Sequence, residues 1–304
     1  MHRADPPNFS SAVHRAGRAR GFAALILANI ALTFGPVFVR LAQADGVGPV
    51  AAGFWRVTLA IPFLLIMLRF SGERMPRLGT VLTGLLIVGG LCFALDLATW
   101  HIGILKTKLA NAALFGNSAV LMFPIYGFII ARAWPSKAQA GALLLALFGA
   151  LLLMGRSYEA SAENLVGDLF CLAAGTLYTG YFIAMTRVRE VLGSWSALFL
   201  STVAASAPLL LVALALNETI WPQDWSALIG LALVSQVIGQ WLMTYALPHF
   251  QPIVIGIALL IQPVVSGAVG WLFYDERLGA LDFIGALAVA IALVLVRRPE
   301  RPAA

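Results

Sequence analysis

Ten apolar segments, each long enough to cross a lipid bilayer, occupy most of the 304-residue chain. They form two groups of five, and a more polar connecting loop at 156–166 separates the groups. Because five is an odd number, the second group crosses the membrane in the orientation opposite to that of the first. This parity predicts an inverted repeat, which many secondary transporters use to build a central site that opens to either side of the membrane.

The composition is that of an integral membrane protein. The chain is 61% hydrophobic and 11% charged, whereas soluble domains are about 45–50% apolar and about 25% charged. A transmembrane helix needs about 20 apolar residues, and most of the ten segments reach that length. Long apolar runs, in place of alternating strands of about ten residues, exclude an outer-membrane barrel. We therefore predict an all-α protein with ten transmembrane helices around a central cavity.

The two repeats are predicted at 21–155 and 167–297, with cytoplasmic tails at 1–20 and 298–304. The spans predicted in the first repeat are Phe22–Leu41, Val50–Leu68, Leu78–Ile104, Leu109–Ala131 and Ala138–Met154. Those predicted in the second repeat are Gly167–Met185, Trp195–Leu216, Trp225–Leu247, Ile253–Tyr274 and Ala280–Val296.

The formal net charge is +6, and the positions of the basic residues indicate one side of a membrane and not a nucleic-acid surface. With ten spans, one face receives most of the 20 basic residues, namely Arg3, Arg15, Arg18, Arg20, Arg69, Arg74, Arg77, Arg132, Lys137, Arg187, Arg189, Arg297, Arg298 and Arg301. The other face receives Arg40, Lys106, Lys108, Arg156 and Arg277. Cytoplasmic loops carry the excess of Lys and Arg, so both termini are predicted to be cytoplasmic. With nine or eleven spans, the basic C-terminus would lie on the side of the membrane opposite to the basic N-terminus.

Few ionisable residues lie inside the spans, and each is a functional candidate because a charge at mid-membrane costs several kcal/mol. Arg56 lies about two turns into the second span, and Asp96 and His101 lie in the outer half of the third. Arg56 is either a structural arginine bonded to carbonyl groups or a gating residue. Asp96 is a candidate for cavity or proton-linked chemistry, and His101 could titrate near physiological pH.

Uncharged polar and aromatic residues recur in corresponding spans of both halves. Gln236, Gln240 and Thr244 are four apart and are therefore predicted to share one helical face. A cavity walled by phenol and indole rings, with amides to bind a carboxylate or an ammonium group, suits a small zwitterion with an aromatic or apolar side chain. Hydrogen bonds between helices are the alternative role for these residues. The predicted cavity residues are Asp96, Trp100, His101, Asn117, Ser118, Tyr178, Tyr181, Gln236, Gln240, Tyr245 and Gln262.

Proline positions also match between the two halves. Pro62 in the second span corresponds to Pro208 in the seventh, and Pro124 in the fourth corresponds to Pro263 in the ninth. Proline removes a helical hydrogen bond and kinks the axis. In a membrane the freed carbonyl has to find another partner. Pro124 and Pro263 are therefore candidates for structural or gating residues, together with Arg56.

Neither a cofactor nor a metal is expected. Of four histidines, His2 and His14 lie in the N-terminal tail, and the two cysteines lie in apolar spans. The sequence has no phosphate-binding GxxxxGK[ST] loop and neither an HExxH nor a GxSxG motif. An intramembrane enzyme is therefore the weaker interpretation. A sugar-phosphate antiporter would favour two or more cations in the cavity, whereas only Arg56 is clearly intramembrane.

Several short motifs resemble those of one transporter family. They are Phe54–Ala60 with Arg56, Gly167-Asp168 at the start of the sixth span, Gln240–Leu247, Pro263, and Asp275–Leu278. In this order along the chain they resemble the EamA-type transporters of the drug/metabolite transporter superfamily, and the resemblance extends over nearly all ten spans.

Within that superfamily the chain is most similar to YddG-type exporters of aromatic amino acids and metabolites in the bacterial inner membrane. The resemblance implies export of aromatic or hydrophobic amino acids by alternating access. Another small metabolite or an amphipathic xenobiotic is the alternative substrate. Proton exchange through Asp96 or His101 and facilitated downhill export are both open, and no oligomeric state follows. The expected partners are the small-molecule substrate, protons if transport is coupled to them, and the lipid bilayer, with no nucleic acid.

Overall fold

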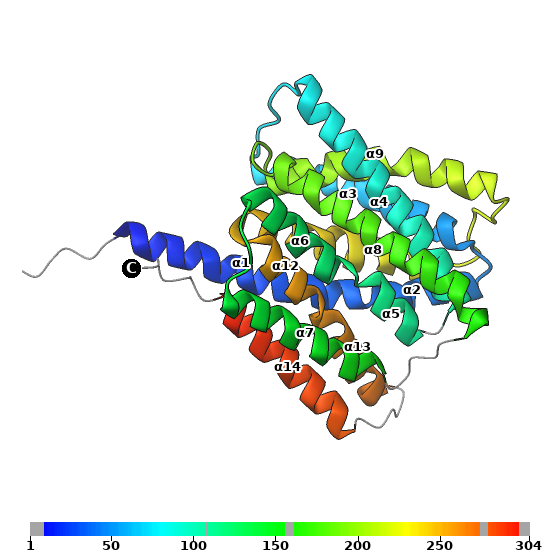
Figure 1. Cartoon of the computed structure of the whole chain (residues 1–304). Helices are drawn as coiled ribbons and strands as arrows, with labels where there is room; N and C mark the ends of the chain where they lie inside the picture. Colours follow the sequence, from blue (N-terminus) through cyan, green and yellow to red (C-terminus); the bar gives the residue numbers. More distant parts are fainter. Residues whose placement is uncertain (1–8, 108, 156–160, 274–278, 298–304) are drawn as a thin grey trace, which may run out of the picture.

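The computed structural model describes residues 9–107, 109–155, 161–273 and 279–297 (Figure 1). These residues form helices joined by short connections, with no strand among them. Seven helical segments are long and apolar enough to cross a membrane, and shorter apolar helices lie at Ala119–Ala131, Lys137–Leu153 and Ala280–Val296. The predicted all-α membrane class is confirmed. The predicted motif Asp275–Leu278 lies outside the described residues.

The helices of the first half follow the predicted spans within a few residues, except that the first begins at Phe9, inside the predicted tail. They are α1 (Phe9–Thr33), α2 (Gly35–Ala44), α3 (Pro49–Ser71), α4 (Thr80–Lys106), α5 (Leu109–Gly116), α6 (Ala119–Ala131) and α7 (Lys137–Gly155).

The helices of the second half include one π-helix, η1, and one short 3-10 helix, η2. They are α8 (Ala162–Val188), α9 (Ser194–Ala215), α10 (Ser226–Gly230), η1 (Leu231–Gly239), α11 (Gln240–Ala246), η2 (Leu247–His249), α12 (Pro252–Leu259), α13 (Ile261–Phe273) and α14 (Ala280–Arg297).

Three predicted spans are interrupted. The first span is divided at Phe34, the fourth between α5 and α6 at Asn117 and Ser118, and the ninth at Leu260. Interruptions of a helix at membrane depth are tolerated where the freed backbone groups are buried in protein or line a cavity. The interruptions therefore indicate where the interior of the bundle departs from simple helix packing.

Helix pairs join the first half of the chain to the second. α3 packs along α9, α6 on α12 and α7 on α14, and each of these pairs joins corresponding spans of the two halves (Figure 1). α4 packs along α8, whereas α1 packs on η1 and α11. α4 and α8 are the third and sixth spans, and α1 and η1–α11 are the first and eighth. Exchanging the two halves therefore turns one of these contacts into the other.

Small residues allow the closest approach between α7 and α14. Gly149 and Gly285 face each other, and a methyl group on either would lie 2.7–2.8 Å from the carbonyl oxygen of the other. Ala142 and Ala146 are buried on the same helix as Gly149. Small residues are the usual means of close helix packing in membranes, where no hydrophobic force draws helices together.

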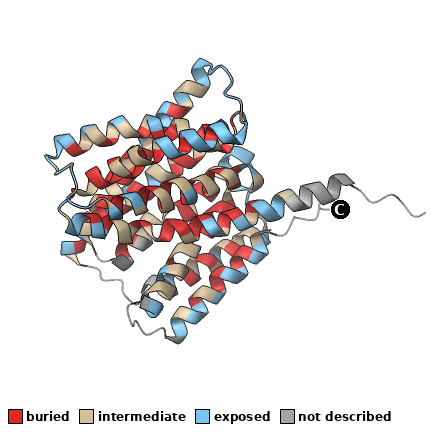
Figure 2. Cartoon of the chain, turned by 180° about the vertical axis from the view of Figure 1, so that it is seen from behind, coloured by how far each residue is buried: buried red, intermediate tan, exposed pale blue. Residues whose placement is uncertain are grey.

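Buried residues follow the central helices, whereas exposed residues cover the outer faces and the helix ends (Figure 2). Large apolar side chains are prominent on the outside, including Ile129 at 68% exposure and Leu211 at 66%. Contiguous apolar surface of this kind is rare on soluble proteins. Acyl chains of a bilayer would cover it.

Candidate functional site

Arg56 is the charged residue around which the interior is organised. α3 directs its side chain inward, where it is only 4% exposed. Its Nε donates a hydrogen bond to Gln236 Oε1 on η1 at 3.1 Å, and its guanidinium lies 5.8 Å from the ring centroid of Phe93 on α4. Gln236 Nε2 in turn donates to Thr202 Oγ1 on α9 at 3.1 Å. Arg56 is thus positioned by helices of both halves.

Asp96 lies on the same helix as Phe93, three residues further on. It is buried and interacts electrostatically with Arg56. No ion pair within 4.0 Å joins these two residues in the described part of the chain. Arg56 and Asp96 therefore lie near each other in the interior without a direct ion pair.

Aromatic rings line this region from α4 and α8. Phe93 stacks on Tyr181 with ring centroids 4.7 Å apart, and Tyr178 stacks on Tyr181 at 5.9 Å. The Tyr178 hydroxyl donates to Gln240 Oε1 at 3.4 Å. Stacked rings provide a flat apolar surface with polar edges.

Three polar atoms next to these rings are buried without a hydrogen-bond partner. They are Tyr181 Oη, Gln240 Nε2 and Thr244 Oγ1. A buried polar group left unpaired costs about 1–3 kcal/mol, and native proteins keep few of them. The Tyr181 hydroxyl faces the side chains of Gln240 and Thr244, so the three groups gather at one place beside the rings. We call the following residues the central polar cluster: Arg56, Asp96, Tyr178, Tyr181, Gln236, Gln240 and Thr244.

Trp100 and His101 lie on α4 beyond the cluster. Trp100 packs between the interrupted spans, because methyl groups on Gly35 and Gly116 would lie 3.8 Å and 3.0 Å from its indole. His101 Nδ1 is 2.8 Å from the carbonyl oxygen of Pro49, and its Nε2 is buried without a partner. His101 thus joins α4 to the start of α3.

The remaining predicted cavity residues lie at the interruptions or near a helix end. Asn117 and Ser118 form the break between α5 and α6, and the buried Ser118 hydroxyl faces α8 without a hydrogen bond. Gln262 Nε2 donates to Asn29 Oδ1 at 3.0 Å, joining α13 to α1. Tyr245 belongs to a separate aromatic row, where its ring centroid is 5.8 Å from that of Trp241.

The two predicted gating prolines occupy different surroundings. Pro124 is buried against Gly256 of α12, where a methyl group would lie 2.8 Å from the proline ring. Pro263 is buried on α13, just after the interruption of the ninth span. Pro124 therefore lies at the contact between the two halves, whereas Pro263 lies beside a helix break.

A further difference from the sequence-based prediction concerns the eighth span. Gln236 and Gln240 were expected on one face of an α-helix, but residues 231–239 form a π-helix with a wider turn. Gln236 consequently contacts α3 and α9, whereas Gln240 contacts α8. π-helical turns are frequent at functional sites.

Sequence reasoning missed several residues that contact the candidates. Thr202 lies on the seventh span and Phe93 is apolar, so neither stood out. Asn29, a buried amide in an apolar span, bonds Gln262. Its polarity at mid-span was the signal that could have found it.

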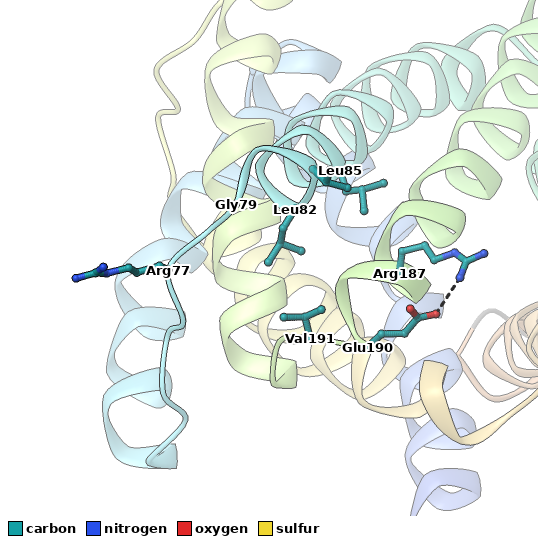
Figure 3. Close-up of a pocket in the computed structure, with 8 residues that line it drawn as sticks. Arg77, Gly79, Leu82, Leu85, Arg187, Glu190 and Val191 are labelled. Atoms are coloured by element: carbon teal, nitrogen blue, oxygen red, sulfur yellow. Dashed lines mark hydrogen bonds and ion pairs between the residues drawn. The ribbon is translucent and has the colours of Figure 1, made fainter.

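A separate hollow of about 650 Å³ lies where α4 begins and α8 ends (Figure 3). Arg187 and Glu190 pair across its edge at 3.2 Å, and Arg77 points away from it. The other lining residues are Gly79, Val81, Leu82, Leu85 and Val191. The hollow shares no residue with the central polar cluster, and its charged groups offer no convergent binding geometry.

The comparisons with known proteins agree on one class. The EamA-like transporter family matches residues 19–155 and again residues 165–298. The pseudopaline exporter CntI of Pseudomonas aeruginosa is 22% identical over 282 residues, covering 91% of this chain and 96% of that protein. An uncharacterised transporter of Archaeoglobus fulgidus is 27% identical over 285 residues, covering 91% and 95%. One solved crystal structure has the same fold, with a TM-score of 0.74, 15% identity and coverage of 93% of this chain and 96% of that one.

Proposed function

This chain belongs to the EamA-like transporter family, and we propose that it exports aromatic or hydrophobic amino acids by alternating access. Membership of this family makes it a multi-pass membrane transporter. Export as the direction of transport is supported by the relative named as an exporter. The amino acid as substrate is inferred from the central polar cluster.

The gathering of buried polar groups beside stacked rings is the observation that carries the proposal. Tyr181 Oη, Gln240 Nε2 and Thr244 Oγ1 are buried together next to stacked rings. Arg56 can bind a carboxylate and Asp96 an ammonium group, each as a charge-assisted hydrogen bond. The rings of Phe93 and Tyr178 would contact an aromatic or apolar side chain.

The proposed architecture is ten spans in two inverted repeats. Two features support it: the family matches the chain twice, once in each half, and the helix contacts are nearly unchanged when the halves are exchanged. The pairs α3 with α9, α6 with α12 and α7 with α14 each correspond to themselves. Following the charge distribution, we assign both termini to the cytoplasm of a bacterial cell and the protein to its inner membrane.

The fourth and ninth spans support an outward-facing arrangement. Their parts near the predicted cytoplasmic side, α6 and α12, pack directly on each other. Their outer parts both contact α7 but differ in their other main neighbour, since α5 packs on α8 whereas α13 packs on α1 (Figure 1). In this proposal the substrate leaves between α5 and α13 and enters after α6 and α12 separate.

Asp96 is the better candidate for proton coupling. It faces Arg56 within the cluster, where its charge would be felt by the substrate. His101 is bonded to the Pro49 carbonyl and joins two helices. Facilitated export without proton exchange is the alternative, and the response to a pH gradient separates the two.

Counterflow in proteoliposomes tests the function. Purified protein loaded with unlabelled phenylalanine should accumulate labelled phenylalanine, with threonine measured in parallel and with and without a pH gradient. Tyr181→Phe should weaken exchange about 10-fold, because it removes a hydroxyl of the central polar cluster and leaves the ring in place. Tyr126→Phe on α6 is the matched control. Absence of exchange of either amino acid by stable wild-type protein would refute the proposed substrate class.

A further inference from the structure

Two glutamates outside the central polar cluster occupy corresponding places in the two halves. Glu73 follows the end of α3, and Glu218 follows the end of α9. Each carboxylate lies at the N-terminus of the other helix. Because α3 and α9 run antiparallel through the membrane, the two glutamates lie at opposite faces.

Glu73 binds the start of α9 through both of its oxygens. Oε2 accepts hydrogen bonds from the Ser196 backbone N and from Ser196 Oγ, each at 2.9 Å. Oε1 accepts from the Trp195 backbone N at 3.2 Å and from Ser194 Oγ at 3.5 Å. A carboxylate at this position satisfies helix N–H groups that have no partner within the helix and interacts favourably with the helix dipole.

Glu218 contacts the start of α3 through one of its oxygens, and a backbone bond adds to this contact. Its Oε2 accepts from the Ala51 backbone N at 2.8 Å, and the Gly48 N donates to the Thr219 carbonyl oxygen at 3.0 Å. The loops that carry the two glutamates also match. Each turns through a residue with left-handed backbone, Gly72 with φ +69° and Asn217 with φ +53°.

Glycine makes room for each carboxylate. Gly193 and Gly48 precede α9 and α3, and a methyl group on either would overlap the bound carboxylate of Glu73 or Glu218. Their φ angles of −62° and −64° are accessible to any residue. The two glycines are thus required for space and not for backbone conformation, which indicates that both carboxylate sites are built for close contact.

A third contact joins the two helices within the membrane. Thr58 Oγ1 and Ser206 Oγ are 3.0 Å apart, and Leu64, Ala60 and Leu198 form a buried apolar group beside them. α3 and α9 are thus connected at one face, in the middle and at the other face. Separation of the helices at either face would break two or more hydrogen bonds and leave helix N–H groups unpaired.

We propose that Glu73 and Glu218 are positioning residues that keep α3 and α9 joined at both membrane faces throughout transport. This helix pair is then the fixed part of the protein, and the other helices move against it to open each side in turn. The pair carries Arg56 and Thr202, so it also provides the invariant wall of the central polar cluster. The proposal rests on the transport function proposed above.

Covalent replacement of each contact tests the proposal. One variant carries Glu73→Cys and Gly193→Cys, and a second carries Glu218→Cys and Gly48→Cys, both in a background with Cys92→Ser and Cys171→Ser. The cysteines are joined by oxidation or by a short bis-methanethiosulfonate. We expect the joined proteins to retain at least half of the exchange rate of the cysteine-free parent, and the reduced proteins to be slower. Exchange that is lost on joining and restored by reduction would overturn the proposal, because the contact would then be a gate.

A distance measurement separates the failure of this proposal from failure of the proposed substrate. Spin labels at Arg74 and Val191 report one end of the pair, and labels at Asp45 and Asn217 report the other. Each distance should remain a single narrow distribution with and without substrate and between pH 5 and pH 8. A second population at either end would contradict a permanently joined pair, whether or not phenylalanine is the substrate. Labels on Leu109 and Ile261 serve as the moving control.

Discussion

The pair α3 and α9 contrasts with the pair formed by the fourth and ninth spans. Both pairs join corresponding spans of the two halves, and both contain prolines. α3 and α9 are continuous despite Pro62 and Pro208, and they are joined at both ends and in the middle. The fourth and ninth spans are interrupted, and α6 and α12 are the parts of these spans that pack closely on each other in the described chain.

The comparison of these two helix pairs indicates that proline alone does not produce a hinge. A proline inside a helix removes one backbone hydrogen bond, and each of these four spans contains such a proline. The second and seventh spans are nevertheless continuous along their described lengths. What distinguishes the continuous helices is the set of contacts that joins them end to end. The interrupted spans divide where the contacts of one part differ from those of the other. We therefore expect motion in spans that are joined to each other over only one part of their length.

The largest effect on transport is expected from a covalent bond that holds α6 and α12 together. Gly127 and Pro252 face each other on α6 and α12, and a methyl group on Gly127 would lie 2.9 Å from Pro252 Cβ. A disulfide between Gly127→Cys and Pro252→Cys should lower counterflow to the level of empty liposomes, and reduction should restore it. The joined Glu73→Cys and Gly193→Cys protein is the matched control. Full exchange by oxidised protein would show that α6 and α12 do not separate.

Loss of Arg56 should produce the next largest effect. Arg56→Ala removes the bond to Gln236 and the contact with Phe93. Hydrogen bonds to charged groups contribute about 1.5–3 kcal/mol, so the apparent affinity for phenylalanine should fall by about 10- to 100-fold. Arg40→Ala, at an exposed position on α2, should leave the affinity unchanged. An Arg56→Ala protein with normal affinity would return this residue to a purely structural role.

Substitution of the glycines next to Glu73 and Glu218 should affect the stability of the protein more than its affinity for substrate. Gly193→Ala and Gly48→Ala force the added methyl group against a carboxylate, and overpacking of this kind typically costs about 1–3 kcal/mol. The apparent Tm in detergent should fall by several degrees. Gly79→Ala is the matched control, because Gly79 also precedes a helix but has open space around its Cα. Equal shifts in all three variants would mean that the loss of glycine at a helix start explains them.

The smallest effect is a pH dependence that arises from Glu218. Partial burial raises the pKa of the Glu218 carboxyl, against the opposing effect of its bonds to backbone N–H groups. A raised pKa in the folded protein means that folding favours the protonated form, so this contribution is present in acid and is lost as pH rises through the raised pKa. The Tm of wild type relative to Glu218→Gln should therefore increase between pH 8 and pH 5. Glu163→Gln, at an exposed carboxyl on α8, should show no such trend.

Arg189 provides a further contact near the end of α8. Its Nε donates to the Thr244 carbonyl oxygen at 3.0 Å, and burial lowers the pKa of its guanidinium. This bond joins α8 to α11 close to two residues of the central polar cluster. The geometry of the cluster thus depends on a contact made at the end of a helix as well as on those within the membrane.

The positions of the helices could be predicted from the sequence because the bilayer imposes a simple rule. Backbone polar groups in hydrocarbon have to be satisfied within each segment, so apolar runs of sufficient length become helices. The second span was predicted at Val50–Leu68 and is observed as Pro49–Ser71. Arg56, Asp96 and Tyr181 attracted attention for the same reason, since polar groups inside a membrane are costly.

The contacts within the candidate site could not be predicted in this way. Arg56 and Gln236 are 180 residues apart, and their bond depends on how α3 meets a π-helix. Sequence periodicity gives little information on such contacts, because every face of these helices is apolar and lipid is as apolar as the interior. Glu73 and Glu218 lie in polar loops, where a charge has no cost that would mark it.

The class of the protein, the location of its helices and the intramembrane residues worth testing could be derived from the amino-acid sequence. These follow from the free energy of placing each segment in water or in hydrocarbon, which is a local property of the chain. Only the tertiary structure decided that α3 and α9 are joined at both faces while the fourth and ninth spans meet at one. That choice depends on hydrogen bonds and close packing between distant segments, whose partners are defined only once the helices have assembled.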